Sequence, residues 1–195
     1  MNGFEKRREN KKNAILNAAL ELFKQFGYNK TSISEIAQKA SVSQVSIYNF
    51  FGSKENLKRE LLSKLLNDYS IETTNILNCP DSIKLKLEKL LASTTDFIKR
   101  FSIHFILESI ENDAFINEHL LEERKKITEA VIALIEKGKS EGVLDNLVST
   151  QSMIVFLEIF QYYFNSNPSA LVKYDNDPEL FKEVSSLFLK ALLMK

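Results

Sequence analysis

Hydrophobic residues between Ala14 and Leu57 recur at helical spacing and fall into four segments. The first segment has a single apolar face, formed by Ile15, Ala19, Leu22, Phe23 and Phe26. Gly27 follows this face directly, in the position where glycine commonly ends a helix. The pattern therefore predicts an amphipathic helix that ends at Gly27 and packs one side on a core.

Two shorter helices are predicted after Gly27, with a tight turn between them. Ser32 and Glu35 have the spacing of a capping box for the first of these helices, whose apolar side is Ile33, Ile36, Ala37 and Ala40. The turn is Ser41-Val42-Ser43, and Ser43 can cap a second helix that runs to Phe50. These lengths match a helix-turn-helix, whose second helix enters the major groove of DNA.

This stretch resembles the N-terminal domain of the tetracycline-repressor (TetR) family of bacterial transcription regulators. The resemblance covers roughly the first 60 residues and rests on Ile15, Ala18, Ala19, Phe23, Gly27, Thr31, Ile36, Ala37, Val42, Ser43, Tyr48, Phe51 and Lys54. It implies an all-α fold of about nine helices, with a DNA-binding domain over residues 1–53 and an effector-binding and dimerisation domain over residues 54–195. One departure is Ser41, which stands where the family's turn usually has glycine, so its backbone must adopt a conformation that is easier for glycine.

The net charge of zero hides an asymmetry between the two parts of the chain. Residues 1–60 hold eleven Lys or Arg and six Asp or Glu, a net charge of +5, whereas the remaining residues hold fifteen and twenty, a net charge of −5. A basic head on an acidic body is typical of a DNA-binding domain joined to a domain with another role. An arm before the first helix is expected to contain Lys6, Arg7, Arg8, Lys11 and Lys12, and either contacts a phosphate or the minor groove or is a solvated tail.

Candidate DNA-contacting residues follow from their place in the helix-turn-helix and are Thr31, Ser43, Gln44, Val45, Ser46, Tyr48, Asn49 and Lys54. On the outward side of the third helix, Gln and Asn can pair with adenine and Val can contact a thymine methyl group. The alternative is a polar helix surface with no reading role. The resemblance implies that Tyr48 and Lys54 bind phosphates, and Thr31 is expected to donate to another phosphate from its place before the second helix.

The rest of the chain predicts about six further helices, over residues 54–77, 83–101, 103–110, 114–139, 153–164 and 180–194. Cys79-Pro80-Asp81 breaks the chain after the first of them, and Gly142 ends the fourth. The last two helices carry apolar residues on more than one side, so each must be covered on more than one side. A second copy of the chain can cover them, which predicts a homodimer that reads an inverted-repeat operator. The expected interface residues are Phe156, Phe160, Tyr163, Val184, Phe188 and Ala191, and the alternative is that both helices lie inside their own domain.

The resemblance also implies an unknown small-molecule effector, which family members usually bind among the fourth to seventh helices. Candidate residues for this pocket are Tyr69, Phe97, Phe101, His104, Phe105 and Glu108, although aromatic residues at helical spacing equally form a core. Glu108, Glu111 and Asp113 would suit a cationic ligand, and a solvated acidic face explains them as well.

Several other classes of protein are disfavoured by the sequence. No G-x-G-x-x-G motif occurs, and Gly138-Lys139-Ser140 is not part of a phosphate-binding G-x-x-x-x-G-K-[ST] loop, because Ala133 stands where that motif has its first glycine. The single cysteine Cys79 cannot form an intrachain disulfide, and no apolar run of about 18 residues could span a membrane. The charged N-terminus leads us to expect no signal peptide and a cytoplasmic protein. His104/Glu108 and His119/Glu123 have metal-ligand spacing, but the Glu-x-x-His pairs of helical metalloenzymes are absent, and we expect neither a metal nor a cofactor.

The sequence therefore predicts a transcriptional repressor that binds an operator as a homodimer and is released by a small-molecule effector. The first alternative is a DNA-binding regulator that has no small-molecule ligand. The second is a helical-bundle enzyme, for which no nucleophile and base pair is evident in the sequence.

Overall fold

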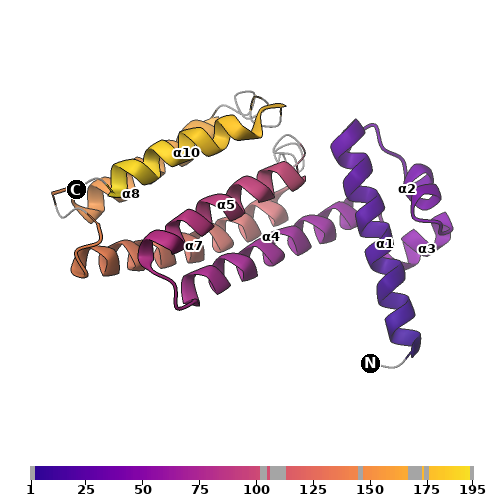
Figure 1. Cartoon of the computed structure of the whole chain (residues 1–195). Coiled ribbons are helices and arrows are strands. Elements are labelled where there is room, and N and C mark those ends of the chain that lie inside the picture. The colour runs from indigo at the N-terminus through magenta and orange to yellow at the C-terminus, as the bar shows by residue number, and fades with distance from the viewer. Residues whose placement is uncertain are drawn as a thin grey trace. The chain divides into compact units, whose positions relative to one another are not determined.

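The computed structural model describes residues 3–101, 105, 113–144, 147–166, 173 and 176–193 of the 195-residue chain. Eight helices lie in these ranges and no strand does (Figure 1), which confirms the all-α prediction. The helices are α1 (Gly3–Phe26), α2 (Ile33–Lys39), α3 (Gln44–Phe51), α4 (Lys54–Asn78), α5 (Ile83–Phe101), α7 (Ala114–Ser140), α8 (Thr150–Ser166) and α10 (Pro178–Leu193).

The chain divides into two compact units. Unit 1 comprises Met1–Leu65 and Phe105–Ile116, and unit 2 comprises Leu66–His104 and Asn117–Lys195. The sequence prediction placed a boundary between residues 53 and 54, at the start of α4, whereas the division between these units falls within that helix.

Unit 1 has a core built on one face of α1. The buried residues of this helix are Ile15, Leu16, Ala18, Ala19, Leu22 and Phe23. The Phe23 ring stacks on Phe105 with 5.5 Å between centroids and meets Tyr28 edge-on at 5.3 Å. The expected burial of Phe26 is wrong, because its side chain is 49% exposed. Phe26 keeps the angular phase of the buried face, but it is the last residue of α1, and periodicity does not set how far along the axis a core extends.

The expected N-terminal arm is also wrong, because α1 begins at Gly3 and includes all five of its basic residues. No glycine or proline interrupts residues 4–26, and Lys, Arg, Glu and Ala are good helix formers. Two side-chain contacts support this part of the helix: the Asn13 amide donates to Glu9 at 3.2 Å, and Lys12 pairs with Glu60.

Unit 2 is held by an apolar cluster from α5, α7 and α8 and the turn after α7. Its buried members are Ile83, Leu87, Leu134, Ile135, Leu144 and Met153. Gly142 lies in the turn after α7 with a positive φ of 68°, as expected of a glycine there. Gly138 is buried inside α7, and a Cβ atom at this position would lie 2.8 Å from the Leu144 side chain. Close packing of α7 on the following turn therefore requires glycine at residue 138.

Candidate nucleic-acid interface

The turn between α2 and α3 sets the direction of the candidate reading helix. At the start of α2, Ser32 and Glu35 form the predicted capping box, in which the Ser32 N–H donates to Glu35 Oε2 at 2.7 Å and the Glu35 N–H donates to Ser32 Oγ at 3.2 Å. The Ser32 hydroxyl also donates to Glu35 Oε2 at 2.7 Å, and this bond, together with the one from the Ser32 N–H, holds the pKa of the Glu35 carboxyl below its usual value. Ser41 has a φ of +54°, the left-handed conformation that its place in the turn predicted, and it is the one non-glycine residue with positive φ among those described.

Helix α3 has one buried and one exposed side. Ser43 caps it, since its Oγ accepts from the Ser46 N–H at 3.1 Å. Ile47 and Phe51 are buried in the unit 1 core. The exposed residues are Ser43, Gln44, Val45, Tyr48 and Asn49, while Ser46 and Phe50 are half-buried. Gln44, Val45 and Asn49 therefore expose two amides and an apolar group on a short helix.

Thr31 and Lys54 are bound within unit 1. The Thr31 side chain is 3% exposed, and its hydroxyl lies 2.9 Å from the Gly27 carbonyl and 3.3 Å from the Leu22 carbonyl. Instead of facing a phosphate, Thr31 ties the chain to the end of α1. Lys54 Nζ donates to the Tyr28 carbonyl at 2.6 Å and lies 4.2 Å from the centroid of the Tyr28 ring. An ammonium has three N–H groups, so Lys54 can hold this carbonyl and still donate to a phosphate.

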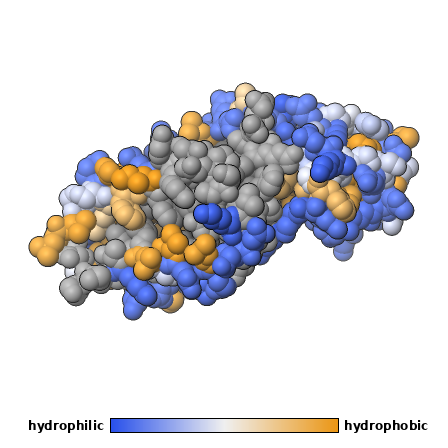
Figure 2. Space-filling model, turned by 90° about the horizontal axis from the view of Figure 1, so that it is seen from above, coloured by the Kyte–Doolittle hydropathy of each residue, from blue (hydrophilic) through white to orange (hydrophobic). Residues whose placement is uncertain are grey.

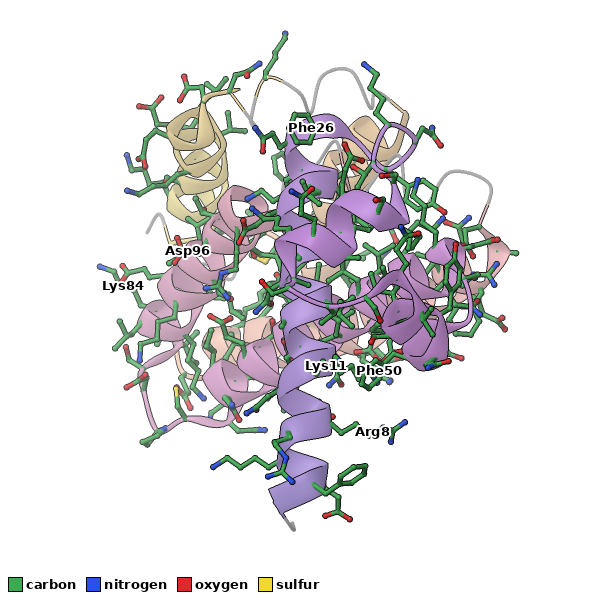
Figure 3. All side chains as sticks on the ribbon, turned by 90° about the vertical axis from the view of Figure 1, so that its right-hand side faces the viewer. Arg8, Lys11, Phe26, Phe50, Lys84 and Asp96 are labelled. Atoms are coloured by element: carbon green, nitrogen blue, oxygen red, sulfur yellow. The ribbon has the colours of Figure 1, made fainter. Side chains whose placement is uncertain are left out.

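Basic residues of α1 adjoin the end of α3. The Arg8 guanidinium lies 5.5 Å from the centroid of the Phe50 ring, and Lys12 Nζ lies 6.0 Å from that of Phe51. Figure 3 shows Arg8 on α1 close to Phe50. Sequence reasoning missed this arrangement because it treated the basic residues as an arm outside the helix.

A buried carboxylate links the start of α7 to α4 inside unit 1. Asp113 is 3% exposed, and its carboxylate accepts from Arg59 Nε at 3.0 and 3.2 Å and lies 3.2 Å from Lys58 Nζ. Its Oδ1 also accepts from the Ile116 N–H at 3.4 Å, which places Asp113 as the cap of α7. Burial alone would raise the pKa of Asp113, but the hydrogen bonds from Arg59, Lys58 and Ile116 outweigh it and lower that pKa. Both sequence-based interpretations of Asp113, as a group for a cationic ligand and as a solvated acid, are wrong, whereas Glu111 lies outside the described residues.

The structure brings together two of the candidate effector-pocket residues. Tyr69 and Phe97 lie in unit 2 with ring centroids 4.7 Å apart, and the Tyr69 hydroxyl is 2.8 Å from Thr94 Oγ1. Burial raises the pKa of the Tyr69 phenol. Phe105 is 2% exposed and belongs to the core of unit 1 through its stack on Phe23. His104, Glu108 and the Phe101 side chain lie outside the described part of the chain.

Two of the six expected interface side chains lie in the described part of the chain. Phe156 on α8 is 49% exposed, and Val184 on α10 is half-buried. Further apolar residues are exposed on these two helices, namely Val155, Ile159 and Leu187. Apolar residues are visible at the surface of unit 2 (Figure 2). The side chains of Phe160, Tyr163, Phe188 and Ala191 lie outside the described part.

Neither a metal cluster nor a membrane-spanning helix occurs in the described ranges. These ranges contain no group of three His, Cys, Asp or Glu residues arranged to hold a metal ion. None of their helices combines the length and the apolar character needed to cross a bilayer.

Comparison with known proteins identifies the type of helix-turn-helix. The family model of "Bacterial regulatory proteins, tetR family" matches residues 15–61. The HTH-type transcriptional regulator YuxN of Bacillus subtilis (strain 168) is 37% identical over 143 residues, which are 71% of this chain and 45% of YuxN, so the matched region spans less than half of that relative. The HTH-type transcriptional regulator RutR of Escherichia coli (strain K12) is 26% identical over 165 residues, 81% of this chain and 76% of RutR.

A solved structure supports the same fold over both units. The transcriptional regulator FadR of Bacillus subtilis, in complex with stearoyl-CoA, matches with a TM-score of 0.67 at 17% identity. The match covers 93% of this chain and 97% of the FadR chain. At this identity the likeness establishes the fold of the chain.

Proposed function

Because this chain belongs to the TetR family and is a DNA-binding transcriptional regulator, we propose that it is a homodimeric repressor released from an inverted-repeat operator by a small molecule. The observation that carries the proposal is the two-sided α3, with Ile47 and Phe51 in the core and Gln44, Val45 and Asn49 exposed. A helix with this division can enter the major groove without loss of its packing.

Base reading is assigned to Gln44, Val45 and Asn49. The amides of Gln44 and Asn49 suit adenine, and the side chain of Val45 suits a thymine methyl group. Ser46 is half-buried beside them, and Ser43 has its hydroxyl 2.9 Å from Ser46 Oγ, so both are proposed to support the start of the helix and to contact the groove edge. Selection of bound duplexes from a random pool tests this assignment. We expect an inverted repeat, and we expect Gln44→Ala and Asn49→Ala each to relax one position of the half-site at a cost of about 1–3 kcal/mol. Gln25→Ala, an exposed glutamine on α1, is the matched control; unchanged operator preference in both α3 variants would contradict the assignment.

Phosphate binding is assigned to Tyr48, which lies among the reading residues on α3, and to Lys54, which follows them. Tyr48 is half-exposed on α3, and Lys54 starts α4 after Ser53, whose Oγ accepts from the Asn56 N–H at 3.0 Å. A homodimer that loses one phosphate-binding charge at each of its two half-sites should have a slope of log affinity against log salt that is shallower by about 1.8, about 0.9 for each charge. We expect this change for Lys54→Ala and none for Lys84→Ala, an exposed lysine on α5 in unit 2. Equal slopes for Lys54→Ala and the unaltered chain would show that Lys54 does not bind a phosphate.

Dimerisation is assigned to α8 and α10. Support comes from the exposed apolar residues Phe156, Ile159 and Leu187, which a second copy would cover. In sedimentation of the full chain, we expect a dimer that Ile159→Glu dissociates. Leu121→Glu, at an equally exposed apolar residue of α7, is the control that should remain dimeric. A dimeric Ile159→Glu variant would refute this interface.

Support for a small-molecule effector comes from membership of the family and from the ligand of one protein of the same fold. FadR of Bacillus subtilis, which has the same fold, was solved in complex with stearoyl-CoA. We propose that unit 2 binds a small molecule beside Tyr69 and Phe97, and that the protein works in the cytoplasm without catalysing a reaction. The ligand can shift the DNA-bound population only by its difference in affinity for the two states. A screen for compounds that release the selected operator tests this part, and a complete absence of release across ligand classes would favour a regulator with no small-molecule effector.

A further inference from the structure

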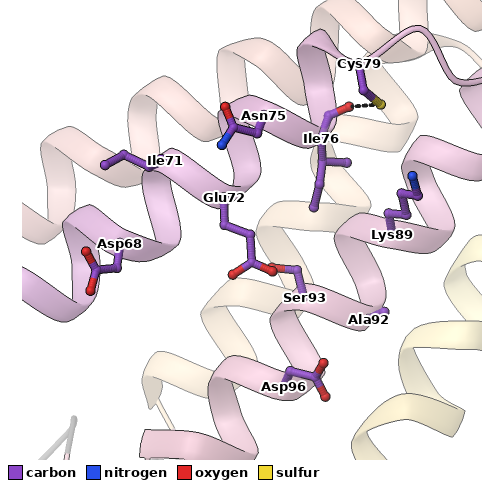
Figure 4. A pocket seen from close by; sticks show the side chains of 10 residues that line it. All are labelled: Asp68, Ile71, Glu72, Asn75, Ile76, Cys79, Lys89, Ala92, Ser93 and Asp96. Atoms are coloured by element: carbon purple, nitrogen blue, oxygen red, sulfur yellow. Dashed lines mark hydrogen bonds between the residues drawn. The ribbon is translucent and has the colours of Figure 1, made fainter.

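An open groove lies between helices α4 and α5 in unit 2 and has a volume of about 560 Å³ (Figure 4). This volume lies within the range of small-molecule sites, about 300–1,000 Å³. The groove is lined mostly by exposed residues of the two helices and does not include Tyr69 or Phe97, the candidate effector residues on the same helices. It is therefore a separate surface feature.

The groove is acidic. Asp68 and Glu72 line it from α4 and Asp96 lines it from α5, against a single basic residue, Lys89. Three carboxylates and one ammonium give the lining a net charge of −2. Lys89 Nζ is bound to Asp81 Oδ2 at 2.5 Å, outside the lining, and this bond raises the pKa of the lysine. The positive charge of Lys89 is therefore neutralised by Asp81 instead of by Glu72 or Asp96.

A buried hydroxyl with no partner lies in the wall of the same groove. Ser93 is 5% exposed, and its Oγ has no hydrogen-bond partner in the structure. Figure 4 shows Glu72 extending from α4 towards Ser93 on α5. Because a buried hydroxyl without a partner is costly, the structure here contains a polar atom that a ligand can satisfy.

The remaining lining includes apolar side chains, among them Ile71, Ile76 and Ala92. Ile71 is 52% exposed, so the groove offers an apolar surface beside its three carboxylates. We propose that the groove binds an organic ammonium ion with a short apolar body. The ammonium lies between Glu72 and Asp96 and donates to Ser93 Oγ, and the hydrocarbon covers the isoleucines. The proposed site is a binding site only, and it requires no effect of the bound ion on the affinity for DNA.

Calorimetric titration of the full chain with hexylammonium tests the proposal, with the neutral isostere 1-hexanol as the matched probe. We expect saturable binding of hexylammonium and at least tenfold weaker binding of hexanol. Glu72→Gln and Asp96→Asn should each weaken hexylammonium about fivefold, because an exposed ion pair contributes up to about 1 kcal/mol. Glu88→Gln, at an exposed carboxylate of α5 outside the groove, should leave the affinity unchanged.

Ser93→Ala tests the same site independently. It should weaken hexylammonium binding and also raise the thermal unfolding midpoint of the ligand-free protein, because it removes a buried polar atom without a partner. Equal affinity for hexanol and hexylammonium, equal loss in Glu88→Gln and Glu72→Gln, or no saturable heat would each overturn the proposal. None of these outcomes bears on operator binding, so the proposed repressor function is tested separately.

Discussion

Replacing Asp113 with asparagine removes a buried charge while it keeps the size of the side chain. Asn can still accept from the Ile116 N–H and cap α7, so the change isolates the interaction with Lys58 and Arg59. Lys58 is 7% exposed and would keep its charge with no carboxylate at 3.2 Å. Removing one partner of a buried pair costs about 3–5 kcal/mol.

The expected loss lies at the lower end of this range, about 3 kcal/mol, because Arg59 has an exposed side and a second partner. Its side chain is 35% exposed, and its Nη2 lies 3.0 Å from Glu55 Oε1. Urea unfolding of the full chain at fixed protein concentration, followed by circular dichroism at pH 7, measures the loss. Glu88→Gln is the control for removal of an exposed carboxylate and should change the free energy of unfolding little.

The same pair has a defined pH dependence. The pKa of Asp113 is lowered in the folded protein, so its contribution is present above the pKa of an unfolded aspartate, about 3.9, and is lost as the pH falls through the lower folded value. The difference in unfolding free energy between the unaltered chain and Asp113→Asn should therefore be constant near neutral pH and shrink below about pH 4. A variant as stable as the unaltered chain at pH 7, or a difference that persists undiminished in acid, would refute the reasoning.

Three further substitutions test the local geometry of the two units, each by urea unfolding. Ser41→Gly should raise the free energy of unfolding by about 0.5–1 kcal/mol, because it relieves about 1–2 kcal/mol of left-handed strain and costs about 0.5–1 kcal/mol in chain entropy; a loss of stability would show that the turn is unstrained. Gly138→Ala should lower it by about 1–3 kcal/mol despite a gain in helix propensity, and the loss should be smaller in a Leu144→Ala background, where only the 3.2 Å approach to Ile83 Cγ2 is left. Ser43→Ala should lower the free energy of unfolding by about 1 kcal/mol through loss of the α3 cap, and it should weaken operator binding by about the same free energy. A change in only one of these two quantities would show that the cap and the DNA-contacting surface act independently.

The faces of the helices could be predicted from the sequence because they depend on residues three or four positions apart. Ile15, Ala19 and Phe23 repeat at a spacing of four residues and are buried. On α3, Ile47 and Phe51 are buried, and Val45 and Asn49 on the opposite side of the helix are exposed. Caps could be predicted for the same reason, since Ser32 and Glu35 act on each other within one turn. Phe26 has the correct phase and is still exposed, because the end of a core is set by other parts of the chain.

The partners of polar side chains could not be predicted, because they lie far along the sequence. Thr31 reaches a carbonyl nine residues away, Lys54 reaches one 26 residues away, and Arg59 binds a carboxylate 54 residues away. Nothing in the local pattern distinguishes these side chains from solvated ones. An acidic residue just before a predicted helix was the one available signal for Asp113, because an aspartate there commonly caps the helix.

These long-range partners bear on how α3 can read DNA. The helix begins at a capped turn fixed by Ser41 and Ser43, and it ends at two phenylalanines that lie against Arg8 and Lys12 of α1. A helix of eight residues is too short to be stable alone, so its rigidity comes from these contacts and from the burial of its inner side. A reading surface that is already ordered loses little conformational entropy on binding, and more of its contact energy appears as affinity. Substitutions of the outward residues should therefore change which sequence is bound, whereas substitutions of the inner contacts should weaken binding to every sequence alike.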